Sequence, residues 1–181
     1  GGFSNVDLRP TNIRKGTRVS YALTNRTYRQ RAIVTHSTGM MDNGWALAFS
    51  GAFRYSQEGY VEGSSFNGGS YFASIMKKIN DQHSLTLSGF GAPTVQERQG
   101  IAVQEAYDLT GNNFYNPYWG WQSNADGSSQ IKRNARVRDN HKPHIFLTHD
   151  FKMEGRKTLT TTAYGIFGRT SNSNLNWYEA P

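Results

Sequence analysis

The chain has 181 residues, of which 36% are hydrophobic, 13% aromatic and 18% charged, and it contains no cysteine. The length suffices for one domain with a sizeable core, and the low share of charged residues argues against intrinsic disorder. The missing cysteines exclude a disulfide framework, a cysteine-ligated zinc and a thiol nucleophile. The formal net charge of +7 raises nucleic acid or another polyanion as a partner.

Alternation of apolar and polar residues predicts half-buried β-strands along the chain. The alternation is clear at 17–24, 45–55, 83–90 and 144–151, and β-rich composition with a blurred pattern marks 29–37, 70–79 and 157–168. Short turns at Asp42-Asn43-Gly44, Asn80-Asp81 and Glu154-Gly155 alternate with long connections at about 56–69 and 91–142. The sequence therefore predicts an all-β fold, an antiparallel up-and-down meander of about seven strands, with a short helix at about 103–111.

The segment 45–55 has two very different sides. Its large side chains alternate with small or charged ones, and they are Trp45, Leu47, Phe49, Phe53 and Tyr55. Ten steps of about 3.3 Å, tilted by about 45°, cover roughly 23 Å, close to the apolar band of about 25 Å with aromatic rims in outer-membrane barrels. A soluble sandwich would mix short and long loops at both ends. We therefore predict a membrane barrel whose lipid-facing residues include these five.

The order of strands, turns and loops resembles a known family. The segment 14–100, from "RKGTRVSYALT" to "GAPTVQERQG", looks like the opening barrel strands of TonB-dependent outer-membrane receptors. The following "QEAYDLTGNNFYNPYWGWQ" at 104–122 resembles the start of a long extracellular loop in some of them. The initial "GGFSNVDLRP" is similar to the junction between plug domain and first strand.

This resemblance implies a 22-stranded transmembrane β-barrel in the Gram-negative outer membrane, with residues 1–12 as the junction and 13–181 as part of the barrel. It implies energised uptake of a nutrient rather than catalysis, through a plug that contacts the TonB–ExbB–ExbD complex. Seven strands cannot close such a barrel, so we expect the plug and the remaining strands in other parts of a longer protein. The short turns would face the periplasm and the long loops the outside. The predicted inward-facing residues are Arg18, Arg54, Ser84 and Thr86.

The long loop supplies the candidate ligand-binding residues. Aromatic rings with polar edges suit sugars, peptides or ring-containing molecules, and they are Tyr115, Tyr118, Trp119 and Trp121. Packing of the loop on itself, or a place in the headgroup belt, would explain the same rings. Arginines can bind an anionic substrate or lipopolysaccharide phosphates, and the candidates are Arg133, Arg136 and Arg138. The expected partners are outer-membrane lipid, lipopolysaccharide, a small-molecule, peptide or glycan ligand, and a surface lipoprotein.

Other chemistry is disfavoured by spacing. A metal site at His141, His144, His149 and Asp150 would need side chains to converge that Pro143 and an extended strand separate. The carboxylates Glu58 and Glu62, or Glu97, Glu105 and Asp108, have no spacing that fixes a general acid–base pair. We predict no catalytic residues, metal or cofactor. A soluble extracellular β-domain that binds carbohydrate through the aromatic loop is the alternative; a nucleic-acid-binding module is weaker, because the basic cluster at 131–142 lacks a stacking platform.

Overall fold

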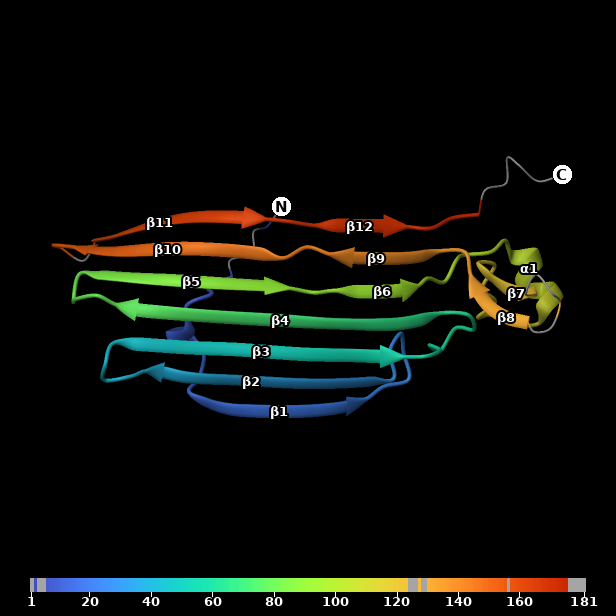
Figure 1. Cartoon of the computed structure of the whole chain (residues 1–181). Helices are drawn as coiled ribbons and strands as arrows, with labels where there is room; N and C mark the ends of the chain where they lie inside the picture. The colour runs from blue at the N-terminus through green and yellow to red at the C-terminus, as the bar shows by residue number, and fades with distance from the viewer. Residues whose placement is uncertain (1, 3–5, 124–126, 128–129, 156, 176–181) are drawn as a thin grey trace.

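The computed structural model describes residues 2, 6–123, 127, 130–155 and 157–175 (Figure 1). These residues form an all-β structure with one short α-helix and one 3-10 turn. No described helix is both long and apolar enough to cross a membrane. The main sheet consists of β1 (Gly16–Leu23), β2 (Gln30–Met40), β3 (Trp45–Ser56), β4 (Ser65–Lys78), β5 (His83–Gly91), β6 (Thr94–Glu97), β9 (Val137–His141), β10 (His144–Met153), β11 (Lys157–Ile166) and β12 (Arg169–Asn172). The other elements are η1 (Pro10–Asn12), α1 (Gln104–Thr110), β7 (Trp119–Ser123) and β8 (Gln130–Asn134).

All pairings in the main sheet are antiparallel, and the strand order is β1-β2-β3-β4-β5-β10-β11. Strand β6 continues β5 alongside β4, β9 continues β10, and β12 continues β11. The ten strands of the described sheet therefore follow seven lines, which confirms the predicted all-β fold and antiparallel meander. Among the described residues the sheet is open, with β1 at one edge and β11 and β12 at the other (Figure 1).

Two prolines interrupt these lines without ending them. Pro93 lies between β5 and β6, and Pro143 lies between β9 and β10. A proline cannot donate to the ladder, so a strand breaks there, but both carbonyls still accept bonds, from Gly69 and Phe167 respectively. The prediction of a loop at 91–142 was therefore wrong at both ends, because pairing resumes beyond each proline and the loop spans only 98–136. The loop predicted at 56–69 is likewise shorter, because β4 begins at Ser65.

The short turns gather at one end of the sheet and the long loops at the other (Figure 1). At the predicted Asp42-Asn43-Gly44 turn, Gly44 has a φ of +76°, a conformation that favours glycine. At the second turn the Asn80 side chain accepts hydrogen bonds from the Gln82 and His83 amides, at 3.0 and 2.7 Å. Both turns therefore form where the sequence predicts them.

One face of the sheet is apolar and exposed. Because directly opposed residues share a face, the register joins Leu47, Ile75, Leu87 and Leu147 into one row across four strands. We call this surface, with the other outward residues of the same strands, the apolar face. No described segment covers it, and its large exposed side chains include Val19, Leu23, Val34, Phe49, Phe53, Leu85, Ile145 and Leu159.

The opposite face, here the polar face, is partly covered by residues 6–13, which we call the strap. Small and hydrogen-bonding residues predominate on this face, and by register it also carries Ile33, Phe66, Phe72, Met76, Phe90 and Phe146. The strap passes behind the sheet in the view of Figure 1. Ser74 Oγ donates to Leu8 O at 2.7 Å, and Ser37 Oγ donates to Pro10 O at 3.2 Å. Ala46 and Ala48 are buried. The predicted inward-facing Arg18, Arg54, Ser84 and Thr86 lie on this face by register.

Candidate functional site

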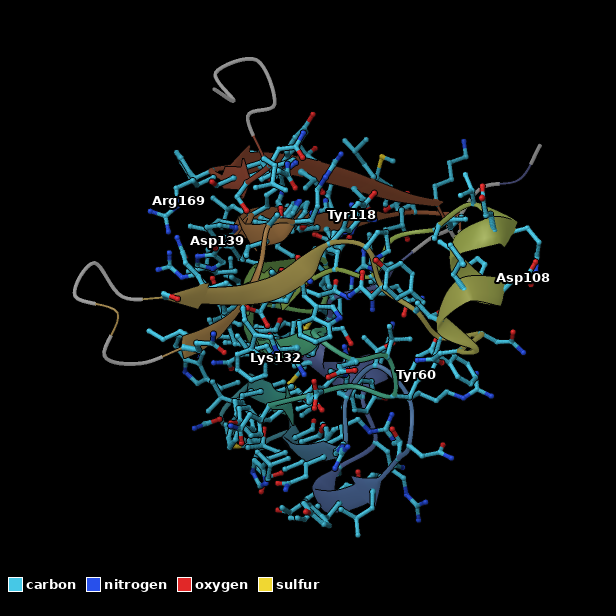
Figure 2. All side chains as sticks on the ribbon, turned by 90° about the vertical axis from the view of Figure 1, so that its right-hand side faces the viewer. Tyr60, Asp108, Tyr118, Lys132, Asp139 and Arg169 are labelled. Atoms are coloured by element: carbon cyan, nitrogen blue, oxygen red, sulfur yellow. The ribbon has the colours of Figure 1, made fainter. Side chains whose placement is uncertain are left out.

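The described residues of 57–64 and 98–136 form a folded layer over one end of the sheet, which we call the loop cap. Figure 2 looks onto this end, with Tyr60, Tyr118 and Lys132 over the strand ends and Asp108 of α1 pointing away to one side. The Tyr60 and Phe114 rings meet edge to face with centroids 5.7 Å apart. Tyr60 Oη accepts a hydrogen bond of 3.3 Å from Gln99. The two loops therefore hold each other.

A lysine joins the two loops through charge. Lys132 Nζ lies 2.6 Å from Glu58 Oε1 and 2.9 Å from Glu62 Oε1, and 4.3 Å from the centroid of the Trp119 ring. Hydrogen bonds from the Gly63 amide and from Lys132 hold the pKa of Glu58 below its usual value. Partial burial opposes the charge of Lys132, but its bonds to both carboxylates prevail and raise its pKa. Glu58 is thus kept ionised, the opposite of what a general acid needs.

Two asparagines fix the backbone of the loop cap. Asn116 is buried; its amide nitrogen donates to Glu62 O at 3.0 Å, and its oxygen accepts from the Gly100 and Tyr118 amides at 3.0 and 3.2 Å. Asn134 donates to the backbone of Gly63 at 2.7 Å. Each side chain therefore satisfies backbone groups from segments far apart in the sequence.

Two of the four predicted aromatic residues pack within the loop cap itself. Trp119 contacts Gly63 so closely that a Cβ added there would come within 2.1 Å of the indole. Tyr118 lies against Gly100, with the Arg136 guanidinium 5.0 Å from its ring centroid. These rings thus have the intramolecular packing that the sequence left open as an explanation.

Trp121 is different, because 60% of it is exposed. Its ring meets that of Trp119 edge to face at 6.2 Å. Tyr115 is half-buried and closes a turn with Asn112. Arg133 donates a hydrogen bond of 2.8 Å to Gln122 Oε1. Of the predicted aromatic residues, Trp121 has the largest free surface for a ligand.

A cavity of about 660 Å³ opens beside the loop cap at the end of β3. It is mostly polar and mixes both signs of charge. Its lining includes Arg29, Tyr55, Glu58, Glu97, Lys132 and Arg133. Of the predicted ligand-binding residues, Arg133 lines this cavity, whereas the four predicted aromatic residues of the long loop lie outside its lining.

The five residues predicted to face lipid all lie on the apolar face and are 37–50% exposed. Lys77 Nζ lies 4.9 Å from the centroid of the Trp45 ring, and the Phe53 and Tyr55 rings stack at 6.1 Å. Within the described strands no second sheet packs on them, which is the arrangement that a membrane-facing surface requires.

The three histidines of the predicted metal site do not converge. His141 Nε2 is 3.0 Å from Tyr71 Oη, His144 stacks on Phe90, and His149 Nε2 is 3.1 Å from His83 Nδ1. No group of three or more His, Cys, Asp or Glu side chains in the described part of the chain could hold a metal ion. Of the predicted carboxylates, Glu58 and Glu62 meet at Lys132. The other three are scattered, since Glu97 ends β6, whereas Glu105 and Asp108 lie on α1.

The ion pair between Arg9 and Asp150 on the polar face was not predicted from the sequence. Arg9 Nε and Nη2 donate to the two oxygens of Asp150, each at 2.8 Å, and Thr160 Oγ1 donates to the same carboxylate at 2.6 Å. The partners are 141 residues apart. No local motif marks such a pair; only the path of the strap across the sheet creates it.

No family model, curated protein or solved structure matches this chain at a significant level. Its function must therefore be argued from the geometry of the sheet and the loop cap.

Proposed function

We propose that this chain is a segment of the barrel of a TonB-dependent receptor, which takes up a nutrient across the Gram-negative outer membrane. The observation that carries the proposal is the apolar face: a single sheet leaves a continuous row of large apolar side chains uncovered. Monomeric soluble proteins rarely expose such a surface, because its transfer out of water is favourable. Lipid would cover it.

The polar face supports the same proposal. Serine, threonine and small residues predominate on it, and it binds the strap through Ser37, Ser74 and Asp150. A chain segment that enters along the inside of the sheet suits the junction between a plug and the first strand. In the proposed receptor this face lines the lumen, and energy reaches it through the plug and the TonB–ExbB–ExbD complex.

The ends of the sheet also differ as a receptor requires. Tight turns would face the periplasm, and the loop cap would face the medium and the ligand. There the β7–β8 hairpin offers the exposed Trp121 ring on one face and the Arg133 guanidinium on the other. These two residues are the ligand contacts that we propose for the loop cap.

Spin labelling tests whether the apolar face meets lipid. Because the chain has no cysteine, single cysteines can be placed at Leu47, Phe49 and Phe53, and as matched controls at Ser50 and Ala52 on the polar face. In liposomes we expect labels on the apolar face to collide with lipid-soluble oxygen and controls with a water-soluble nickel complex. A loss of this alternation, or a chain that stays monomeric in water with labels 47, 49 and 53 immobile, would overturn the proposal.

A further inference from the structure

Two arginines of neighbouring strands stand directly opposite each other on the polar face. The register runs across six pairings of the sheet, and the row reads Ala22, Arg31, Arg54, Gly68, Thr94, Asn140 and Thr170. The row therefore places two guanidinium groups side by side among small, hydroxyl and amide residues.

Such an arrangement is unfavourable without a ligand. Directly opposed residues have Cβ atoms about 4.5–5.5 Å apart, and like charges at that position destabilise a sheet. Neither Arg31 nor Arg54 forms an ion pair among the described residues. The Nε of Arg31 is buried and lacks a hydrogen-bond partner in the same part of the chain. A buried donor without a partner is unfavourable, so an acceptor from a ligand would stabilise the site.

Two aromatic rings lie beside the second arginine, Arg54. The Arg54 guanidinium lies 5.6 Å from the centroid of the Tyr28 ring, and Tyr28 lies 6.0 Å from the ring of Phe66. Phe66 occupies the space beside Gly68, where an added Cβ would come within 2.8 Å of the ring. Arg54 therefore lies over the Tyr28 ring, with Arg31 opposite it on the neighbouring strand β2.

The described strands around the two arginines offer them no free carboxylate. Among the described strands of the main sheet, Asp150 is the single acidic residue whose register position lies on the polar face, and Arg9 already binds it. The two remaining strand carboxylates, Glu97 and Asp139, pair with neighbours on the opposite face. Within the described strands, the face of the arginine pair therefore carries no unpaired carboxylate.

We propose that Arg31 and Arg54 form a binding site for an oxyanion, a carboxylate or phosphate carried by the transported molecule, with Tyr28 and Phe66 against its apolar body. Only the statement that the bound molecule is transported rests on the proposed function. Guanidinium groups bind both oxyanions through paired hydrogen bonds, and two of them would engage one anion from two sides. Arg54 is exposed, and the hydrogen bonds of the strap to this face go to other residues, Ser37, Ser74 and Asp150.

Calorimetry on the full chain in detergent tests the site with two probes, pyrophosphate for the phosphate class and citrate for the carboxylate class. We expect at least one probe to bind, and the double variant Arg31→Gln/Arg54→Gln to bind it at least tenfold more weakly. Arg18→Gln, on the same face of β1, is the matched charge control and should change binding less than twofold. Arg31→Lys/Arg54→Lys keeps the charge without the planar fork and should fall in between.

Folding of the variants is checked independently. Removing opposed like charges should leave the thermal stability of the anion-free chain unchanged or higher, and the alternation of lipid access at 47–52 should persist. No binding by the wild-type chain, or equal weakening in Arg18→Gln, would overturn the oxyanion site. Either result leaves the membrane proposal standing, because that proposal depends on the labels at 47–52.

Discussion

The ion pair between the strap and the sheet gives a prediction with a definite size. Asp150→Asn keeps the shape of the side chain but removes its charge and turns one acceptor into a donor against Arg9. The wild-type pair has two bonds of 2.8 Å, and the side chains of Asp150 and Arg9 are 9% and 30% exposed. Breaking a fully buried pair costs about 3–5 kcal/mol, and a bond to a charged group contributes about 1.5–3.

The cost of breaking this pair should lie toward the lower end of that range, because Arg9 is partly exposed and has a second carboxylate, Asp7, at 2.9 Å. We expect a loss of about 2–3 kcal/mol in the free energy that holds the strap down, which is about a 30- to 150-fold increase in strap opening. Hydrogen exchange of peptide 6–15 measures it, because the amides of Asn12 and Ile13 are protected by bonds inside η1.

An exposed ion pair serves as the control. Asp139 and Arg169 are 3.2 Å apart, with 38% and 79% of their side chains exposed, and such pairs contribute about 0–1 kcal/mol. Asp139→Asn should leave strap exchange unchanged. If Asp150→Asn also leaves it unchanged, the pair does not hold the strap and the reasoning fails.

Three further predictions concern the loop cap. Asn116→Ala should speed amide exchange at 98–118 by tenfold or more, because buried backbone groups lose their partner; unchanged exchange would contradict it. Gly63→Ala should shift the tryptophan emission as Trp119 is displaced, whereas Gly155→Ala, with a similar φ of +73° and open space, should not. Because folding lowers the pKa of Glu58, its contribution to the stability of the loop cap is complete above its ordinary pKa of 4.5 and is lost as the pH falls through the lower folded pKa. Hydrogen exchange of the loop cap should therefore speed up at low pH, and a stability of the loop cap that stays constant down to about pH 3 would refute this.

Strands and turns could be predicted because their causes are local. Alternation sets the two faces of a strand, and Asn43-Gly44 supplies the backbone freedom of a tight turn. Strand ends were harder. Pro93 and Pro143 resemble strand terminators in a sequence, but a neighbouring strand on each side keeps the ladder in register across them. Local signals alone cannot report that support.

Contacts across the sheet could not be predicted for a different reason. Arg31 and Arg54 are opposed because the β2–β3 hairpin includes a register shift between Ser37 and Gly39. Without that irregularity, counting back from the turn pairs each residue of one strand with the wrong partner. The loop cap is harder still, since Lys132 and Glu58 lie 74 residues apart and meet only once seven lines of strand are in place.

The single-sheet architecture explains the amino-acid composition of the chain. The length of the chain predicted a sizeable core, yet the buried hydrophobic residues of the described chain are Ala46, Ala48, Val61 and Met76. Most of the large apolar side chains of the described sheet lie instead on its exposed apolar face, while small and polar residues predominate on the opposite face, which the strap partly covers. A sheet built this way gains little from burial in water. Under the proposed function the missing burial comes from lipid on the apolar face, so low hydrophobic content and exposed aromatic residues are two consequences of the same fold.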